Sequence, residues 1–280
     1  MNIQWYPGHM TKSVRMMEEQ IALVDIVIEL LDARVPRSSK NPDIDRLARN
    51  KKRILALNKS DLADSGATEQ WASYYSQNGC NAVVIDSQSG AGLKQLGDMC
   101  IALMAEKTER EKKRGRVFVP VRAMVAGIPN VGKSTFINRF VGKSPAKAAD
   151  RPGVTRGRQW IRLKRGFELL DTPGILWPKL DDPETGVNLA LTGAVSDNVA
   201  DSAELCRVLI DKLNALYPAA LRERYGAEAS GGAAETLEII AKSRGYGKKA
   251  GEPDLERAAS AVINEFRAGK LGRITLERAE

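Results

Sequence analysis

Histidine, cysteine and aromatic residues are scarce in this chain of 280 residues, which has one histidine, three cysteines and 5% aromatic residues. Cys80, Cys100 and Cys206 lie far apart and form no Cys-x-x-Cys pair, so we expect buried thiols rather than a zinc site or a disulfide framework. No apolar run approaches the roughly 20 residues that cross a bilayer, and the N-terminus lacks the apolar core of a signal peptide. These absences predict a soluble, cytoplasmic protein without a membrane partner.

The charge is unevenly distributed along the chain. The net charge is +8, but residues 1–177 carry 29 Lys/Arg against 18 Asp/Glu, whereas residues 178–280 carry 14 against 17. The basic clusters lie at 51–53, 112–116 and 151–165. Each cluster alone could equally be a solvated face or a linker. Together they favour a partner rich in phosphate, and the length suggests two domains.

The most informative stretch is 127–135, Gly-Ile-Pro-Asn-Val-Gly-Lys-Ser-Thr, which has the spacing of a phosphate-binding loop. An apolar run at 117–126 precedes it, and an expected helix at 135–141 follows it. Glycines let backbone N–H groups turn inward around phosphate oxygens, and a helix start adds positive potential. We expect Lys133 to reach the terminal phosphates and Ser134 to ligate Mg²⁺. The other expected nucleotide contacts of this loop are Asn130, Val131, Gly132 and Thr135.

A second motif, Asn58-Lys59-Ser60-Asp61, follows the apolar strand expected at 54–57. A carboxylate only accepts hydrogen bonds, so Asp61 can pair with the N1–H and amine of guanine, whereas adenine presents an unprotonated N1. The alternative is a helix N-cap formed by Ser60 or Asp61. Because a phosphate loop is present in the same chain, we favour guanine recognition by Asn58, Lys59, Ser60 and Asp61.

Two further loops complete the expected nucleotide site. Asp86 and Ser87 follow a strand expected at 82–85, in the place of the loop whose backbone N–H contacts the guanine carbonyl in GTPases. The usual Ser-Ala-Lys is absent there, so the expectation rests on the position of the loop more than on its side chains. After the phosphate loop, Thr155 could complete the Mg²⁺ shell. Asp171 would then hold a Mg²⁺-bound water and the Gly174 N–H would sense the γ-phosphate, although a short Asp-x-x-Gly is also common in turns.

The order of these motifs predicts the fold. In an ordinary Ras-like GTPase the phosphate loop comes first, but here 58–61 and 86–87 precede it, and nearby termini allow such a permuted chain to rebuild the same sheet. We therefore predict an α/β fold in which a circularly permuted Ras-like P-loop GTPase domain at 1–178, with an N-terminal extension at 1–24, precedes a small all-α domain at 179–280.

Periodicity predicts the helices around these motifs. We expect a helix at 93–107 followed by an exposed connector at 108–116. In the second half, we expect helices at 184–194, 200–216, 219–225, 234–244 and 255–267. The segment 242–249, basic around Tyr246, is either a contact for RNA or a solvated loop.

Several segments together resemble the bacterial ribosome biogenesis GTPase A family. They are Trp5-Tyr6-Pro7-Gly8-His9-Met10, Asp32-Ala33-Arg34-Val35-Pro36 with Asn41-Pro42, and Asp171 to Pro178. The resemblance covers nearly the whole chain. It implies GTP hydrolysis during late assembly of the large (50S) ribosomal subunit, stimulated by that particle, with ribosomal RNA and ribosomal proteins as partners and a monomer off the ribosome.

The catalytic group is less certain from sequence. Ile175 stands where Ras-like enzymes have a glutamine, and an apolar side chain cannot orient water by hydrogen bonding. The resemblance implies that His9 positions the water, although His9 could be a structural turn residue. It also implies that Asn130 helps to bind K⁺, whereas a simple loop hydrogen bond is the alternative. A metabolic P-loop kinase and a GTP-dependent adaptor without hydrolysis remain open as other functions.

Overall fold

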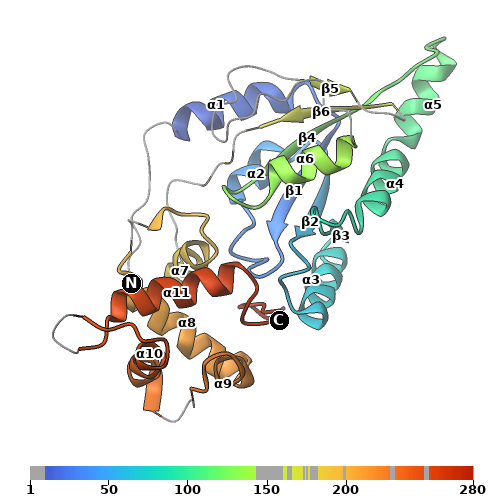
Figure 1. Cartoon of the computed structure of the whole chain (residues 1–280). Coiled ribbons are helices and arrows are strands. Elements are labelled where there is room, and N and C mark those ends of the chain that lie inside the picture. The colour runs from blue at the N-terminus through green and yellow to red at the C-terminus, as the bar shows by residue number, and fades with distance from the viewer. Residues whose placement is uncertain are drawn as a thin grey trace.

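The computed structural model describes residues 10–142, 160–162, 166–172, 174, 176, 182–197, 200–227, 231–248 and 252–279. A twisted sheet flanked by helices lies beside a group of helices from the second half of the chain (Figure 1). The strands are β1 (Ile26–Asp32), β2 (Lys52–Asn58), β3 (Asn81–Val84), β4 (Val121–Gly127), β5 (Trp160–Arg162) and β6 (Phe167–Asp171). The helices are α1 (Met10–Ile21), α2 (Pro42–Leu47), α3 (Ser65–Gln77), α4 (Leu93–Leu103), α5 (Ala105–Lys113), α6 (Lys133–Val141), α7 (Pro183–Leu191), α8 (Ser202–Leu216), α9 (Ala219–Tyr225), α10 (Gly232–Ser243) and α11 (Leu255–Arg267).

The sheet has the order β3-β2-β1-β4-β6-β5. Neighbouring strands are parallel except β5, which runs antiparallel to β6. Parallel strands end at a common edge, and loops at that edge form the ligand crevice of such sheets. The loops that follow β2, β3, β4 and β6 carry the predicted nucleotide motifs, so the permuted order brings them to one edge as expected.

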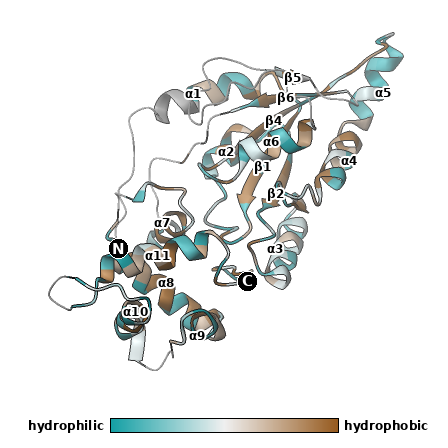
Figure 2. Cartoon of the chain, in the orientation of Figure 1, coloured by the Kyte–Doolittle hydropathy of each residue, from teal (hydrophilic) through white to brown (hydrophobic). Residues whose placement is uncertain are grey.

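Alternating side chains explain why helices cover both faces of the sheet. On one face, Val27 and Met124 pack with Met17 of α1 and Ile44 of α2. The other face packs against α4 and α6 through the residues Ile28, Val125, Leu96 and Phe136. The strands are accordingly the most continuous hydrophobic segments in Figure 2.

One secondary-structure prediction is wrong. Residues 93–107 form two helices, because the chain turns at Met104, and most of the expected connector at 108–116 belongs to α5. The sequence of α5 consists largely of good helix formers. In addition, the side chain of Glu111 is buried and pairs with Arg114 and Arg116. The high charge of this segment led to the prediction of an exposed connector, but charged residues of these types also form helices.

The segment 271–279, which follows α11, packs between the helical part and the sheet. Ile274 N donates to Leu62 O, and Leu276 N donates to Arg34 O. The buried carboxylate of Glu277 accepts hydrogen bonds from the backbone N–H of Arg37 (2.6 Å) and from other donors on Ser38 and Asn188. This segment therefore ties α7 to the loop that follows β1.

The cysteines and one basic cluster can be compared with the expectations from composition. Cys100 and Cys206 are buried free thiols, whereas Cys80 is only half-buried. In the basic cluster at 51–53, Arg53 is directed inward and pairs with Glu29 at 2.6 Å, so its charge is used inside the fold. No helix within the described ranges is both long and apolar enough to cross a bilayer.

Candidate nucleotide site

The two motifs predicted to read the base and hold the phosphates lie in direct contact. Asn58 Nδ2 donates to Val131 O at 2.8 Å, and Lys59 Nζ donates to Asn130 O at 2.6 Å. Gly132 lies so close that a Cβ there would come within 2.6 Å of Asn58 Nδ2. The loops after β2 and β4, which are far apart in the sequence, thus form one continuous rim at the edge of the sheet.

The loop after β3 is fixed to the same rim. Asn58 Oδ1 accepts hydrogen bonds from Ser87 N at 3.1 Å and from Ser87 Oγ at 2.7 Å. The carboxylate of Asp86 closes its own turn by accepting from Gln88 N (2.7 Å) and Ser89 N (3.2 Å). The side chains of Asn58, Asp86 and Ser87 therefore hold the loops in place.

Asp61 lies at the outer end of the guanine motif. Partial burial and the nearby carboxylate of Asp86 raise the pKa of Asp61, whereas Arg34 and Arg273 oppose the rise. Helix α3 begins after Asp64, whose side chain accepts from Ala67 N and forms the N-cap. The alternative in which Ser60 or Asp61 caps a helix is therefore not what the structure shows. The Asp61 carboxylate is left without a capping role.

Lys133 lies at the centre of the phosphate side. Its Nζ donates to Ile128 O at 2.7 Å and to Gly127 O at 3.2 Å, so it is held within its own loop. A Cβ on Gly174 would lie 2.7 Å from this Nζ, which places Gly174 directly against the amine. Burial lowers the pKa of Lys133 to about 8, and the Asp171 carboxylate opposes that shift.

This lowered pKa predicts that nucleotide binding takes up a proton at mildly alkaline pH. A phosphate beside Lys133 would favour its charged form and raise its pKa above the unbound value of about 8. Between the two pKa values the complex binds more protons than the free protein, so GDP affinity should fall as the pH rises above about 8. Calorimetry at that pH in buffers of different ionisation enthalpy would measure the uptake. Equal apparent enthalpies in all buffers would contradict it.

Ser134, Thr135 and Asp171, on the phosphate side of the site, carry the hydroxyl and carboxylate oxygens that Mg²⁺ prefers as ligands. Ser134, in the first turn of α6, is exposed, as is Thr135, and Asp171 ends β6 with its side chain half-buried. Burial raises the pKa of Asp171, and the positive charge of Lys133 opposes the rise. The charges of Asp171 and Lys133 therefore interact with each other. His9, Thr155 and Ile175 lie outside the described residues.

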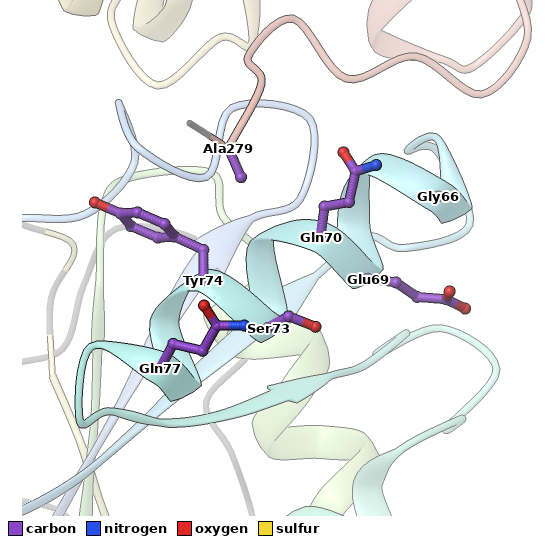
Figure 3. A pocket seen from close by; sticks show the side chains of 7 residues that line it. All are labelled: Gly66, Glu69, Gln70, Ser73, Tyr74, Gln77 and Ala279. Atoms are coloured by element: carbon purple, nitrogen blue, oxygen red, sulfur yellow. The ribbon is translucent and has the colours of Figure 1, made fainter.

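A separate hollow of about 570 Å³ lies along the outer side of α3 (Figure 3). Its lining is Gly66, Glu69, Gln70, Ser73, Tyr74, Gln77 and Ala279. The side chains drawn there include one carboxylate and no positive group to bind phosphate. Its position and chemistry separate it from the nucleotide site.

The structure also shows two charged residues that motif analysis had not assigned to the site. Asp32, at the end of β1, pairs with Arg34 at 2.7 Å and with Lys59 at 2.9 Å. Burial disfavours the charge on Asp32, but these two cations outweigh it and hold the pKa of Asp32 below its usual value. In the sequence, the Asp32-Ala33-Arg34 segment is marked only by the family resemblance. Its position directly after a buried strand is the signal that places it at the ligand edge of the sheet.

Comparisons with known proteins agree with this geometry. A family model described as "50S ribosome-binding GTPase" matches residues 122–233. Ribosome biogenesis GTPase A of Bacillus cereus is 43% identical over 100% of this chain and 95% of the relative. The protein of the same name from Priestia megaterium is 45% identical over 99% of this chain and 97% of the relative.

Solved structures agree as well. The GNP-bound structure of YlqF from Thermotoga maritima has a TM-score of 0.70 and 28% identity, covering 95% of this chain and 98% of that one. The GDP-bound structure of the same protein has a TM-score of 0.69 and 28% identity, covering 94% and 99%. With similarity at this level along the whole chain and a permuted GTPase sheet, the protein belongs to the ribosome biogenesis GTPase A family and is a GTP hydrolase.

Proposed function

We propose that this GTPase acts at a late step of large ribosomal subunit assembly, and that the subunit precursor stimulates its hydrolysis of GTP. The observation that carries the nucleotide-binding part of the proposal is the contact between Lys59 and Asn130, which joins the guanine motif to the phosphate loop. Similarity to proteins named for ribosome biogenesis supports the cellular process.

Each group in this site has a proposed role. Asp61 accepts hydrogen bonds from the N1–H and amine of guanine, and Lys133 neutralises the terminal phosphates. Ser134, Asp171 and Thr155 would hold Mg²⁺, which when bound neutralises charge on the phosphate oxygens. The Gly174 N–H donates to the γ-phosphate, so the segment after β6 responds to hydrolysis.

Two catalytic roles rest on the family rather than on described geometry. We propose that His9 positions the attacking water, because an isoleucine at 175 cannot do so. We also propose that Asn130 contributes an oxygen to K⁺ beside the phosphates. Its amide nitrogen already donates to Gly193 O at 2.7 Å, which leaves the amide oxygen for such a cation.

The partner proposed is the precursor of the large subunit, with its RNA and proteins. The net charge of +8 supports attraction to RNA, and the basic excess lies in residues 1–177. We propose a GTPase domain at 1–178 and a helical domain at 179–280, acting in the cytoplasm as a monomer when off the ribosome.

The test is GTP hydrolysis with and without purified large subunits, in K⁺ and in Na⁺. We expect stimulation by the subunits, a lower rate in Na⁺, and a lower stimulated turnover in a His9→Ala variant with GTP affinity little changed. Stimulation that is fully retained in that variant would remove His9 from the mechanism. A rate that subunits leave unchanged would favour a GTP-dependent adaptor instead.

A further inference from the structure

Asn130 of the phosphate loop has a strained backbone. In the described part of the chain, Lys59 (φ 62°) and Asn130 (φ 57°) are the non-glycine residues with positive φ. Such conformations are less favourable for a non-glycine residue than the ordinary helical or extended ones, and they persist where the surroundings impose them. The two strained residues are bonded to each other through Lys59 Nζ and Asn130 O.

The side chain of Asn130 is held by the helical part of the protein. Its Nδ2 donates to Gly193 O at 2.7 Å. Gly193 lies in the segment 190–197, here called the loop 190–197, which comprises the last two residues of α7 and the turn that follows them. Gly193 has φ 75°, and a Cβ on it would lie 3.4 Å from the guanidinium of Arg267. The loop therefore passes closely between the phosphate loop and Arg267.

Arg267, the last residue of α11, fixes the loop 190–197 in place. Its Nε donates to Leu191 O at 3.0 Å, and its Nη2 donates to Ala190 O at 2.8 Å. The same guanidinium pairs with Asp197 at 2.6 Å. One planar, charged group thus binds both ends of the loop whose middle carries Gly193, and a lysine could not reproduce this set of bonds.

A second set of contacts links α11 to Lys59 of the guanine motif. Arg267 O accepts from Arg34 Nη1 at 3.3 Å, and the Arg34 guanidinium lies over the Phe266 ring with 5.4 Å between its Cζ and the ring centroid. Arg34 pairs with Asp32, which pairs with Lys59. A closed ring of bonds therefore runs from the phosphate loop through the helical part and back. Arg34, Lys59, Asn130, Gly193 and Arg267 of this ring line one cavity of about 430 Å³.

We infer that Arg267 is a positioning residue for GTP hydrolysis, which acts through Gly193 to set the geometry of Asn130. The inference rests on the proposed function and adds to it a route from the helical part to the phosphate loop. A partner that shifts α11 relative to the sheet would alter the hydrogen bond to Asn130 without touching the nucleotide. The loop 190–197 would then carry the effect of such a partner to the phosphates.

The test is a double-mutant cycle on turnover, with Arg267→Lys, Asn130→Ala and the double variant. Arg267→Lys keeps a positive charge near Asp197 but loses the fork that holds the two carbonyls. We expect kcat to fall roughly tenfold with KM for GTP little changed, as for the loss of a charge-assisted hydrogen bond. Because Arg267 acts through Asn130, adding Arg267→Lys to Asn130→Ala should cause no further fall.

Arg224→Lys is the matched control, because Arg224 also pairs with α11, at Glu265, and has no contact with the loop 190–197 among the described residues. Its kcat should equal that of the unaltered protein. Thermal unfolding of every variant shows whether it is folded. If Arg267→Lys does not fold, Gly193→Ala tests the same loop at a position where a Cβ is strained.

Additive losses in the cycle, or a kcat unchanged in both Arg267→Lys and Gly193→Ala, would overturn the inference. Stimulation of the unaltered protein by large subunits in the same assay would show that the proposed function holds independently of that result. If the unaltered protein does not hydrolyse GTP under any tested condition, the proposed function fails as well.

Discussion

Replacing Asp61 with asparagine should abolish tight GTP binding and create a preference for xanthosine triphosphate. In the proposed site the carboxylate accepts from guanine N1–H and the amine, whereas an amide at position 61 would direct its own N–H₂ at that amine. A site built to hydrogen-bond one group rejects the wrong partner strongly, so GTP affinity should fall on the order of a thousandfold or more. Xanthine carries a carbonyl in place of the amine and can accept from the new amide. Titration with fluorescent GTP and XTP analogues would measure both changes.

Asp64→Asn is the control for this exchange, since it is the same chemical change three residues further along the chain. Asp64 caps α3 by accepting from Ala67 N at 2.8 Å, and asparagine is an equally good N-cap. GTP affinity should therefore stay unchanged. If Asp61→Asn bound GTP as tightly as the unaltered protein, Asp61 would not read the base.

Replacing Gly174 with alanine should stop hydrolysis while GDP binding is largely kept. A Cβ there would lie 2.9 Å from Pro129 Cα and 3.0 Å from Pro129 N, and these backbone atoms cannot move aside without distorting the phosphate loop. The segment after β6 must therefore shift away, and its N–H would no longer reach the γ-phosphate. Loss of a donor aimed at developing charge costs roughly a hundredfold or more in kcat. Single-turnover hydrolysis and GDP titration would separate the two effects.

Gly97→Ala serves as its control. Gly97 lies within α4, and a Cβ there would make only an ordinary contact of 3.7 Å with Phe140. Hydrolysis should be unchanged, and stability should rise slightly because alanine favours a helix. Normal hydrolysis by Gly174→Ala would show that this segment does not sense the γ-phosphate.

The motifs and their order sufficed to predict the sheet and its loops, because each motif follows a buried strand and parallel strands share an edge. The contacts that fix the loops could not be predicted in this way. Asn130 meets Gly193 across 63 positions, and Glu277 meets Arg37 across 240 positions. No local pattern encodes such pairs, since they depend on how α7 and α11 pack against the sheet. Asn58 likewise lies at the end of β2 as expected, but its hydrogen bonds to Val131 and Ser87 could not be predicted from the motif.

The strand order has a consequence for assembly. Strands β3, β2 and β1 come from one continuous stretch of chain and β4, β6 and β5 from the next, so the sheet consists of two half-sheets joined along a single seam between β1 and β4. The guanine motif belongs to one half-sheet and the phosphate loop to the other. A nucleotide bound to both motifs would hold the two half-sheets together. The stability of the folded protein should therefore rise with the nucleotide concentration.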